Sequence, residues 1–391
     1  MIAAACLALA ALAPDPAGAW RGVLDLAGGP LKFGLRVSAD GGAWRAAICN
    51  GAQCADAGPA RLVGTDSLVI DLTDYAATIA ARVSADSLLG HYSNVGNRGP
   101  RVIPFRASRG TWAPSALPRG FAGSWDATLV TDGRPSPRLF VISEDSAGAA
   151  SAVVSNTGDY GAFWGEVRGD TVAFSHFDGS FVYMYTARLD GDTLRGEFHA
   201  GLRTRTPFTA VRSSGAPHLR PPTAMTSADT TEPFRFAFPD LDGTLVTNAD
   251  ERFRGKVVVV DVFGTWCATC HYAAPILERF QQEYGPRGLA VVGLAYEVTG
   301  DTAVDGALVR RYREKFGLSF PLLLAGIGTA EAAAPTLPQL NGFTAFPTTI
   351  FLGRDGRVRL VHAGFYGPAT GAMHERQVAE FRTVIEELLV E

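Results

Sequence analysis

The chain has 391 residues, of which 47% are hydrophobic and 19% are charged, and its formal net charge is −4. This composition is typical of a globular protein, and the length predicts two or three domains of ~150 residues each. The negative charge argues against a nucleic-acid partner, because phosphate binding needs a clustered basic face. After the N-terminus no apolar run reaches the ~18 residues of a membrane-spanning helix, so we expect no internal span.

The first 13 residues, M-I-A-A-A-C-L-A-L-A-A-L-A, resemble the apolar part of a signal peptide with an A-L-A cleavage site. They predict export to the periplasm or cell envelope, although no Lys or Arg precedes the apolar run. A lipoprotein acylated at Cys6 is the alternative, which the apolar residues after Cys6 disfavour. Without residues 1–13, the remaining cysteines form two close pairs, as suits an oxidising compartment.

Residues 14–215 are predicted to be all-β, because short apolar runs alternate with Gly, Asn, Asp and Ser at roughly ten-residue spacing. The region holds two tandem copies of one unit, 14–115 and 116–215. Each begins with G-x-W and ends with P-F-x-A-x-R. Each copy has room for roughly seven or eight strands, which predicts a meander barrel or a sandwich. The G-x-W start weakly resembles lipocalin-like and avidin-like barrels, so a small apolar ligand is possible.

Cys49 and Cys54 flank the sequence N-G-A-Q. Asn-Gly is a strong hairpin signal, and a four-residue loop would bring the two cysteines opposite each other. We expect a structural disulfide here. A second redox pair that exchanges with Cys267 is the alternative.

The second copy carries aromatic residues on one face of a predicted strand, at Phe181, Tyr183 and Tyr185. Core packing is the simplest interpretation of this stripe. The alternatives are an apolar cavity or a face on which the C-terminal domain docks.

A linker of residues 216–231, rich in Pro, Ser and Thr, precedes the C-terminal domain of residues 232–391. The central stretch of this domain runs K-V-V-V-V-D-V-F-G-T-W-C-A-T-C-H-Y-A-A-P over residues 256–275. Its valine run predicts a strand covered on both faces, and the apolar spacing after the second cysteine predicts a helix.

Cys267 and Cys270 fall on one face of the first turn of that helix. Free backbone N–H groups and the helix dipole favour a thiolate there, and a thiolate is the nucleophile of disulfide exchange. We expect Cys267, at the strand–helix corner, to be the exposed attacking sulfur, and Cys270 to be the buried resolving sulfur. Such exchange needs no cofactor, and none is expected.

The region of about 234–391 resembles thioredoxin, and more closely the TlpA/ResA-like branch of that fold. The matching features, in order, are Asp261 in the strand, W-C-x-x-C, Pro275 as the kink proline, F-P-T-T at 346–349 as the cis-Pro loop, and Gly356 and Gly364 of the final hairpin. The resemblance implies an α/β thioredoxin-like fold and thiol–disulfide oxidoreductase activity. One position departs, because ResA-like proteins carry a Glu where this chain has Ala273.

Two carboxylates are candidates for moving the proton of Cys270. Asp261 interrupts the valine run, where burial would raise its pKa towards neutrality. Glu297 ends the predicted strand 289–297 and could stand in for the Glu missing at Ala273; a solvated loop carboxylate is the other interpretation.

The remaining candidate residues surround the thiols. We expect Pro347 to follow a cis peptide bond, Trp266 to shield the thiols, and Phe346 to shape the substrate groove. For the two aromatic residues, plain core packing is the alternative.

A competing motif is C-x-x-C-H, the attachment pattern of c-type haem, with His271 and Met373 as possible iron ligands. The buried strand before it and F-P-T-T after it disfavour haem. A zinc site would need two more ligands with only His271 close in sequence, so we expect no metal.

The sequence therefore predicts an exported thiol–disulfide oxidoreductase that reduces protein disulfides and receives electrons from a membrane or periplasmic thiol donor. The uncharged Ala268 and Thr269 between the cysteines favour the reducing direction. A disulfide oxidase or isomerase is one alternative. The other is a ligand- or partner-binding β module with an appended redox domain.

Overall fold

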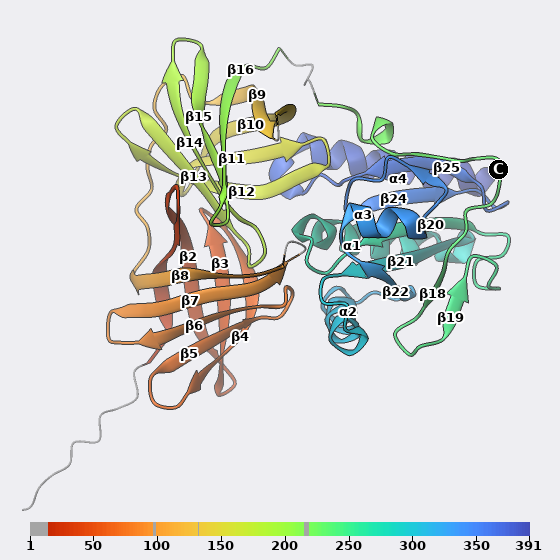
Figure 1. The fold of residues 1–391 in the computed structure, drawn as a ribbon, viewed down its shortest axis with the longest axis horizontal. Helices are drawn as coiled ribbons and strands as arrows, with labels where there is room; N and C mark the ends of the chain where they lie inside the picture. Colours follow the sequence, from red (N-terminus) through yellow and green to blue (C-terminus); the bar gives the residue numbers. More distant parts are fainter. Residues whose placement is uncertain (1–14, 97–98, 132, 215–218) are drawn as a thin grey trace, which may run out of the picture.

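The computed structural model describes residues 15–96, 99–131, 133–214 and 219–391. The predicted signal peptide, with Cys6, lies outside the described residues. Figure 1 shows two β-barrels stacked on one side of the molecule and an α/β domain on the other. Within the described part of the chain, no helix is long and apolar enough to cross a membrane.

The first barrel is a closed meander of eight antiparallel strands, in which β1 pairs with both β2 and β8. Its strands are β1 (Gly18–Leu26), β2 (Gly29–Asp40), β3 (Ala43–Asn50), β4 (Gln53–Val63), β5 (Ser67–Leu72), β6 (Ala77–Val83), β7 (Ser87–Gly96) and β8 (Gly99–Arg109). Buried and less buried residues alternate along β5 and β6, as expected when one face of a strand lines a core. The inward side chains form one buried apolar cluster.

The second barrel repeats this topology, with β9 pairing with both β10 and β16. Its strands are β9 (Gly123–Thr131), β10 (Arg134–Asp145), β11 (Gly148–Ser155), β12 (Gly158–Arg168), β13 (Thr171–Phe177), β14 (Val182–Asp190), β15 (Thr193–Ala200) and β16 (Thr204–Arg212). The predicted tandem all-β repeat is confirmed, in the form of two barrels.

The aromatic stripe of β14 faces the interior of the second barrel. Tyr185 is fully buried and stacks against Phe140 and Phe174, with ring centroids 4.7 and 4.8 Å away. Tyr183 packs at the edge of the same core. Core packing is therefore the right interpretation for Tyr185, and the filled interior counts against a ligand cavity there.

The two barrels close with the same pair of residues. Trp20 is 1% exposed and lies under the Arg109 guanidinium, 4.1 Å from the ring centroid. Trp125 is 0% exposed and lies under Arg212 at 4.3 Å. In each barrel the arginine also donates to a backbone carbonyl just before the first strand. The G-x-W and x-R ends of the sequence repeat are thus a cation–π contact across the closing strands.

The first barrel borrows part of its core from the second. Phe177, at the end of β13, is fully buried and lies 4.7 Å from Phe33 and 5.1 Å from Tyr92, measured between ring centroids. Val182 and Met184, on the outward face of β14, belong to the same cluster. The core of the second barrel contains no residue of the first among those described.

The α/β domain is built on a mixed five-stranded sheet, in the order β22-β21-β20-β24-β25. These strands are β20 (Val257–Phe263), β21 (Leu289–Glu297), β22 (Leu322–Ile327), β24 (Thr348–Leu352) and β25 (Val358–Ala363). The first three are parallel, and β24 and β25 are antiparallel to their neighbours. Every residue of β20 is buried, as the valine run predicts for a central strand.

Helices and short elements cover both faces of this sheet. The α-helices are α1 (Ala268–Tyr284), α2 (Thr302–Phe316), α3 (Ala330–Ala333) and α4 (Ala372–Val390). The short strands are β17 (Ser227–Ala228), β18 (Ala237–Pro239), β19 (Leu245–Thr247) and β23 (Leu340–Asn341), and the 3-10 turns are η1 (Pro222–Ala224), η2 (Gly285–Arg287), η3 (Ala334–Thr336) and η4 (Pro368–Thr370). Helices α1, α2 and α4 share one core with the sheet, and the β18–β19 hairpin and α3 share the other.

Candidate active site

The two free cysteines lie where β20 ends and α1 begins. Cys267 is the N-cap residue of α1, in an extended conformation, and the helix starts at Ala268. The backbone N–H of Cys270 donates to the carbonyl of Cys267 at 3.0 Å, which closes the first turn. Both thiols are free. The strand–turn–helix context predicted for the pair is therefore present.

Both thiols are buried, and the prediction that Cys267 would be exposed is wrong. Cys267 is 3% exposed and Cys270 is 0% exposed. The Cys267 Sγ faces the carbonyl oxygen of Phe346 at 3.4 Å. The prediction failed because it considered the α/β domain alone, whereas loops of both barrels pack over the start of α1.

An aromatic wall lines the side of the site formed by the 346–349 loop. The Phe346–Pro347 peptide bond is cis. The Trp266 and Phe346 rings meet edge to face, with centroids 5.4 Å apart. The Trp266 indole N–H donates to the carbonyl of Tyr296 at 2.8 Å, which fixes the ring. Both aromatic residues therefore lie beside the thiols, and their roles towards a substrate stay predictions.

Asp261 lies on the face of β20 that points towards α1. Asp261 shares this face with Val259 and Phe263, which belong to the core cluster that also contains Cys270. Asp261 is 3% exposed, and its Oδ1 atom has no hydrogen-bond partner. Burial raises the pKa of Asp261 to about 7. A carboxyl group that is half-ionised near neutral pH can both accept and return a proton.

The pKa of Cys270 is also raised. Burial is the main cause, and its interactions with Cys267 and the charge of Asp261 add to the shift. A negative charge on Asp261 thus disfavours the Cys270 thiolate, as expected for like charges in one buried core.

Glu297 is buried and not a solvated loop carboxylate, with 1% of its surface exposed. It accepts hydrogen bonds from the N–H and the hydroxyl of Thr265, at 2.8 and 2.7 Å. Burial raises the pKa of Glu297 to about 8. Its carboxyl group holds the turn immediately before Trp266 and Cys267.

Two residues of the site carried no recognised signal in the sequence. The Tyr312 hydroxyl, on α2, donates to the carbonyl of Cys270 at 2.9 Å. The ring of Tyr75, in the first barrel, stacks on His271 with centroids 4.9 Å apart. Both come from segments far from the C-x-x-C motif in sequence.

His271, the residue that suggested haem, packs between the first barrel and helix α2. Its Nε2 atom bonds to the Thr265 carbonyl at 2.7 Å, and its ring is enclosed by Tyr75, Tyr312 and Phe316. Burial lowers the pKa of His271 to about 4, so the ring is neutral at pH 7.

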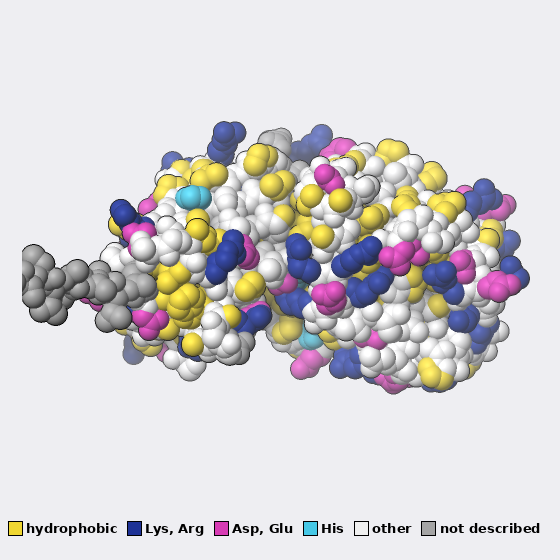
Figure 2. All heavy atoms as spheres, turned by 90° about the horizontal axis from the view of Figure 1, so that it is seen from below, with side chains coloured by type: hydrophobic (Ala, Val, Ile, Leu, Met, Phe, Trp, Pro, Cys, Tyr) yellow, Lys and Arg dark blue, Asp and Glu magenta, His cyan; other side chains and the backbone are white. Residues whose placement is uncertain are grey.

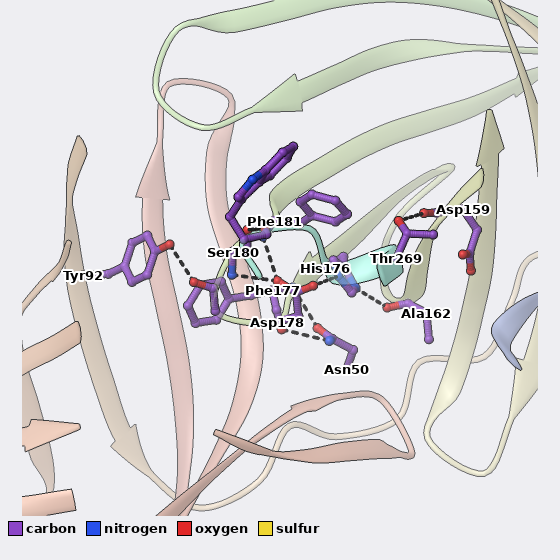
Figure 3. A network of polar contacts seen from close by, with 12 residues as sticks. Asn50, Tyr92, Asp159, Ala162, His176, Phe177, Asp178, Ser180, Phe181 and Thr269 are labelled. Atoms are coloured by element: carbon purple, nitrogen blue, oxygen red, sulfur yellow. Dashed lines mark hydrogen bonds and ion pairs between the residues drawn. The ribbon is translucent and has the colours of Figure 1, made fainter. Parts of the chain in front are cut away.

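The second barrel bonds directly to the C-x-x-C segment, as Figure 3 shows. The Ser180 hydroxyl donates to the Trp266 carbonyl at 2.8 Å. The Thr269 hydroxyl, between the two cysteines, donates to the Asp159 carbonyl at 3.3 Å. The Asp159 side chain in turn accepts from the Gly367 N–H at 2.9 Å. These contacts come from Ser180 and Asp159, which are not part of the aromatic stripe, so docking of the C-terminal domain on the stripe itself stays a prediction.

The second cysteine pair forms a disulfide between Cys49 and Cys54, across the β3–β4 turn. Asn50, inside this turn, makes two reciprocal bonds to Phe177. Its amide N–H₂ donates to the Phe177 carbonyl at 2.9 Å, and its oxygen accepts from the Phe177 N–H at 3.0 Å. The stapled turn thus holds the end of β13 in the second barrel.

Comparison with known proteins places similarity in the C-terminal region. Residues 226–373 match the family model described as Redoxin. The chain is 28% identical over 152 residues to the thiol-disulfide oxidoreductase ResA of Halalkalibacterium halodurans, over 39% of this chain and 73% of that protein. It is 27% identical over 111 residues to the thioredoxin-like protein YneN of Bacillus subtilis, over 28% of this chain and 58% of that protein.

Among solved structures, the chain is similar to a thioredoxin-family thiol:disulfide interchange protein from Chlorobium tepidum. The identity is 23%, the TM-score is 0.32, and the match covers 42% of this chain and 99% of that one. Both barrels lie outside the residues that match the Redoxin model.

A C-x-x-C pair at the start of a helix, on a five-stranded sheet, defines a thioredoxin-like domain. Residues 226–373 are a Redoxin domain, and this part of the chain is similar to thiol-disulfide oxidoreductases named ResA.

Proposed function

We propose that the chain is an exported thiol–disulfide oxidoreductase that reduces protein disulfides through Cys267 and Cys270. The observation that carries the proposal is the position of the two free thiols on the first turn of α1, with Cys267 against the loop of Pro347. A helix N-terminus stabilises negative charge on a sulfur placed there.

The reaction transfers two electrons from the dithiol to a substrate disulfide. The Cys267 thiolate attacks one substrate sulfur and forms a mixed disulfide, and the other substrate sulfur leaves as a thiolate that takes up a proton. Cys270 then loses its proton and attacks the Cys267 sulfur. The substrate sulfur that was bonded to Cys267 leaves as a thiolate and takes up a proton, and a Cys267–Cys270 disulfide remains.

Asp261 is the base that we assign to the Cys270 proton. Its pKa of about 7 lets it accept that proton near neutral pH, and its open Oδ1 atom leaves an acceptor site for it. Glu297 acts as a positioning residue, because its two bonds to Thr265 set the turn that carries Cys267. Phe346, Pro347 and Trp266 line the groove for the substrate chain.

The reducing direction is favoured by what surrounds the nucleophile. Ala268 and Thr269 carry no charge, and His271 is neutral at pH 7, so no side chain within the motif stabilises the thiolate strongly. The oxidised protein would be reduced again by the dithiol of a donor protein in the cell envelope. Export rests on residues 1–13 and on the Cys49–Cys54 disulfide, with a lipoprotein anchored through Cys6 as the alternative.

The direct test is the reduction potential of the Cys267–Cys270 pair, measured by equilibration with glutathione and with thioredoxin. A value near or below about −270 mV supports a reductant, whereas a value near about −120 mV makes the protein a disulfide donor. A Cys49→Ser/Cys54→Ser variant is the matched control, and its Cys267–Cys270 potential should be unchanged.

Trapping tests the roles of the two thiols. Cys270→Ser should accumulate a mixed disulfide through Cys267, because resolution is blocked, and Cys267→Ser should form none. Mass spectrometry of the trapped species identifies the attached thiol. Equal trapping in both variants would contradict the assignment.

A further inference from the structure

Two segments of the barrels contact residues on either side of the two cysteines, Trp266 and His271. One is the loop of residues 178–181, between β13 and β14, here called the cap loop. The other is the turn of residues 73–76, between β5 and β6, here called the cap turn. Both lie at the ends of the barrels that face α1, and neither belongs to the Redoxin domain.

The cap loop is bonded to the segment that carries Cys267. The Ser180 hydroxyl donates to the Trp266 carbonyl, one residue before the thiol. The loop is itself rigidly built, because the Asp178 carboxylate accepts from the N–H groups of Ser180 and Phe181 at 2.8 and 2.7 Å. From the first barrel, the Tyr92 hydroxyl donates to the Gly179 carbonyl at 2.9 Å. Figure 3 shows this chain of contacts running from one barrel to the other and on to α1.

The cap turn closes the site from the first barrel. The Tyr75 ring stacks on His271, one residue past Cys270. Burial raises the pKa of Tyr75, and negative charge on Asp178 and Asp74 adds to this rise. Gly179 has a φ of +103°, and a Cβ there would come within 2.9 Å of the Tyr75 ring, so the loop and the turn are in contact.

Helix α2 clamps the cap turn in place. Lys315 forms an ion pair with Asp74, and the Arg311 guanidinium donates to the Thr73 carbonyl at 3.3 Å. Figure 2 shows Lys and Arg side chains gathered beside the waist between the two lobes. These contacts join the first barrel to the Redoxin domain without involving either cysteine.

We propose that the cap loop and the cap turn are an access-controlling lid, through which the barrels select the disulfides that reach Cys267. A thiol that is 3% exposed cannot take the in-line approach that disulfide exchange needs. The lid therefore opens before a bulky substrate engages, and Tyr75, Ser180 and the Asp74–Lys315 pair set how often it does. This inference rests on the proposed function only in taking Cys267 as the attacking thiol.

Alkylation of Cys267 by iodoacetamide tests the lid in the full-length, reduced protein, with peptide mapping to separate Cys267 from the other cysteines. Because labelling requires opening, its rate follows the open population. Tyr75→Ala should label Cys267 about tenfold faster than the wild type, and Ser180→Ala and Asp74→Ala about fivefold faster.

Asp66→Ala is the matched control for Asp74→Ala. Asp66 also pairs with a basic side chain, Arg82, but this pair lies within the first barrel. It should label at the wild-type rate, and thermal unfolding of each variant separates a local opening from general destabilisation. If Tyr75→Ala, Ser180→Ala and Asp74→Ala all fold and label like the wild type, the lid is refuted.

Two further results separate the lid from the proposed function. A labelling rate in the wild type that already equals that of an unfolded peptide containing Cys267 would refute the lid without any variant. A lid that opens as expected, in a protein whose Cys267–Cys270 pair cannot be cycled by thiol donors, would leave the lid standing and refute the oxidoreductase.

Discussion

The two barrels have the same meander and the same Trp–Arg contact at their closing strands, but only the second has a core made of its own residues. The first barrel includes Phe177, Val182 and Met184 of the second in its core. It also carries the Cys49–Cys54 disulfide, whereas Val154 and Asp159 occupy the paired positions of the second barrel. The second barrel is instead packed around stacked aromatic rings.

This difference shows which parts of a barrel repeat are fixed by closure and which are free to change. The Trp–Arg contact recurs because each sheet must close on itself. The turns at the barrel ends have diverged, because in this chain they form contacts between domains. The β3–β4 turn holds Phe177, and the 178–181 loop that follows Phe177 bonds to Trp266, the residue before Cys267.

The largest expected effect comes from the closing tryptophans. Trp20→Ala and Trp125→Ala should each cost about 3–5 kcal/mol of unfolding free energy, since both rings are buried. The two variants should differ in how much of the structure they destabilise, because the core of the first barrel includes residues of the second. Hydrogen exchange should show lost protection in both barrels for Trp125→Ala, and mainly in the first for Trp20→Ala. Unchanged protection of the first barrel in Trp125→Ala would show that the borrowed residues contribute little.

A smaller effect concerns the contact of the second barrel with the Redoxin domain. Burial raises the pKa of Asp159 to about 6, from its ordinary value of 3.8. The ionised carboxylate is therefore less favourable in the folded than in the unfolded protein. This penalty is fully present above pH 6 and fades as the pH falls towards 3.8.

Asp159→Asn should remove that penalty, because the amide oxygen can still accept from Gly367. At pH 8 we expect the variant to be more stable than the wild type by at most about 3 kcal/mol, with the difference shrinking at pH 4.5. Thermal unfolding at the two pH values is the measurement. A variant that is less stable at pH 8 would mean that the charge itself holds the domains together.

The smallest effect on stability is expected at the β3–β4 turn, which the Cys49–Cys54 disulfide closes. Asn50→Ala leaves the N–H and carbonyl of Phe177 without their partner, which should cost about 1–2 kcal/mol. Asn156→Ala, in the corresponding turn of the second barrel, is the control. Asn156 makes one exposed bond to the Arg220 N–H, so its loss should be within about 0.5 kcal/mol. Urea denaturation compares the two, and equal losses would remove the distinction between the turns.

The parts of the structure that were predicted from sequence are those set by local signals. The valine run and the W-C-x-x-C turn specify a buried strand followed by a helix, and Asn50 with Gly51 specifies the turn that the disulfide closes. The ends of the sequence repeat fall on the strands that close each barrel, although the Trp–Arg contact between those strands was not predicted.

The parts that were missed depend on contacts between distant segments. The burial of Cys267 follows from packing of both barrels on α1, and no spacing within residues 256–275 reports it. Tyr75 and Tyr312 are ordinary members of a turn and of an amphipathic helix. Only the folded chain brings them to the cysteines.

Phe177 also bears on the history of the chain. Tandem copies of a unit can ordinarily be lost or gained singly, because each copy buries its own core. Here the second copy supplies a side chain to the centre of the first, between Phe33 and Tyr92. Deleting the second copy would remove Phe177 and leave a cavity in the first barrel, which would destabilise that barrel as the loss of any large buried aromatic side chain does. The first barrel therefore depends on the second for part of its core, and the two copies form one folding unit rather than two interchangeable ones.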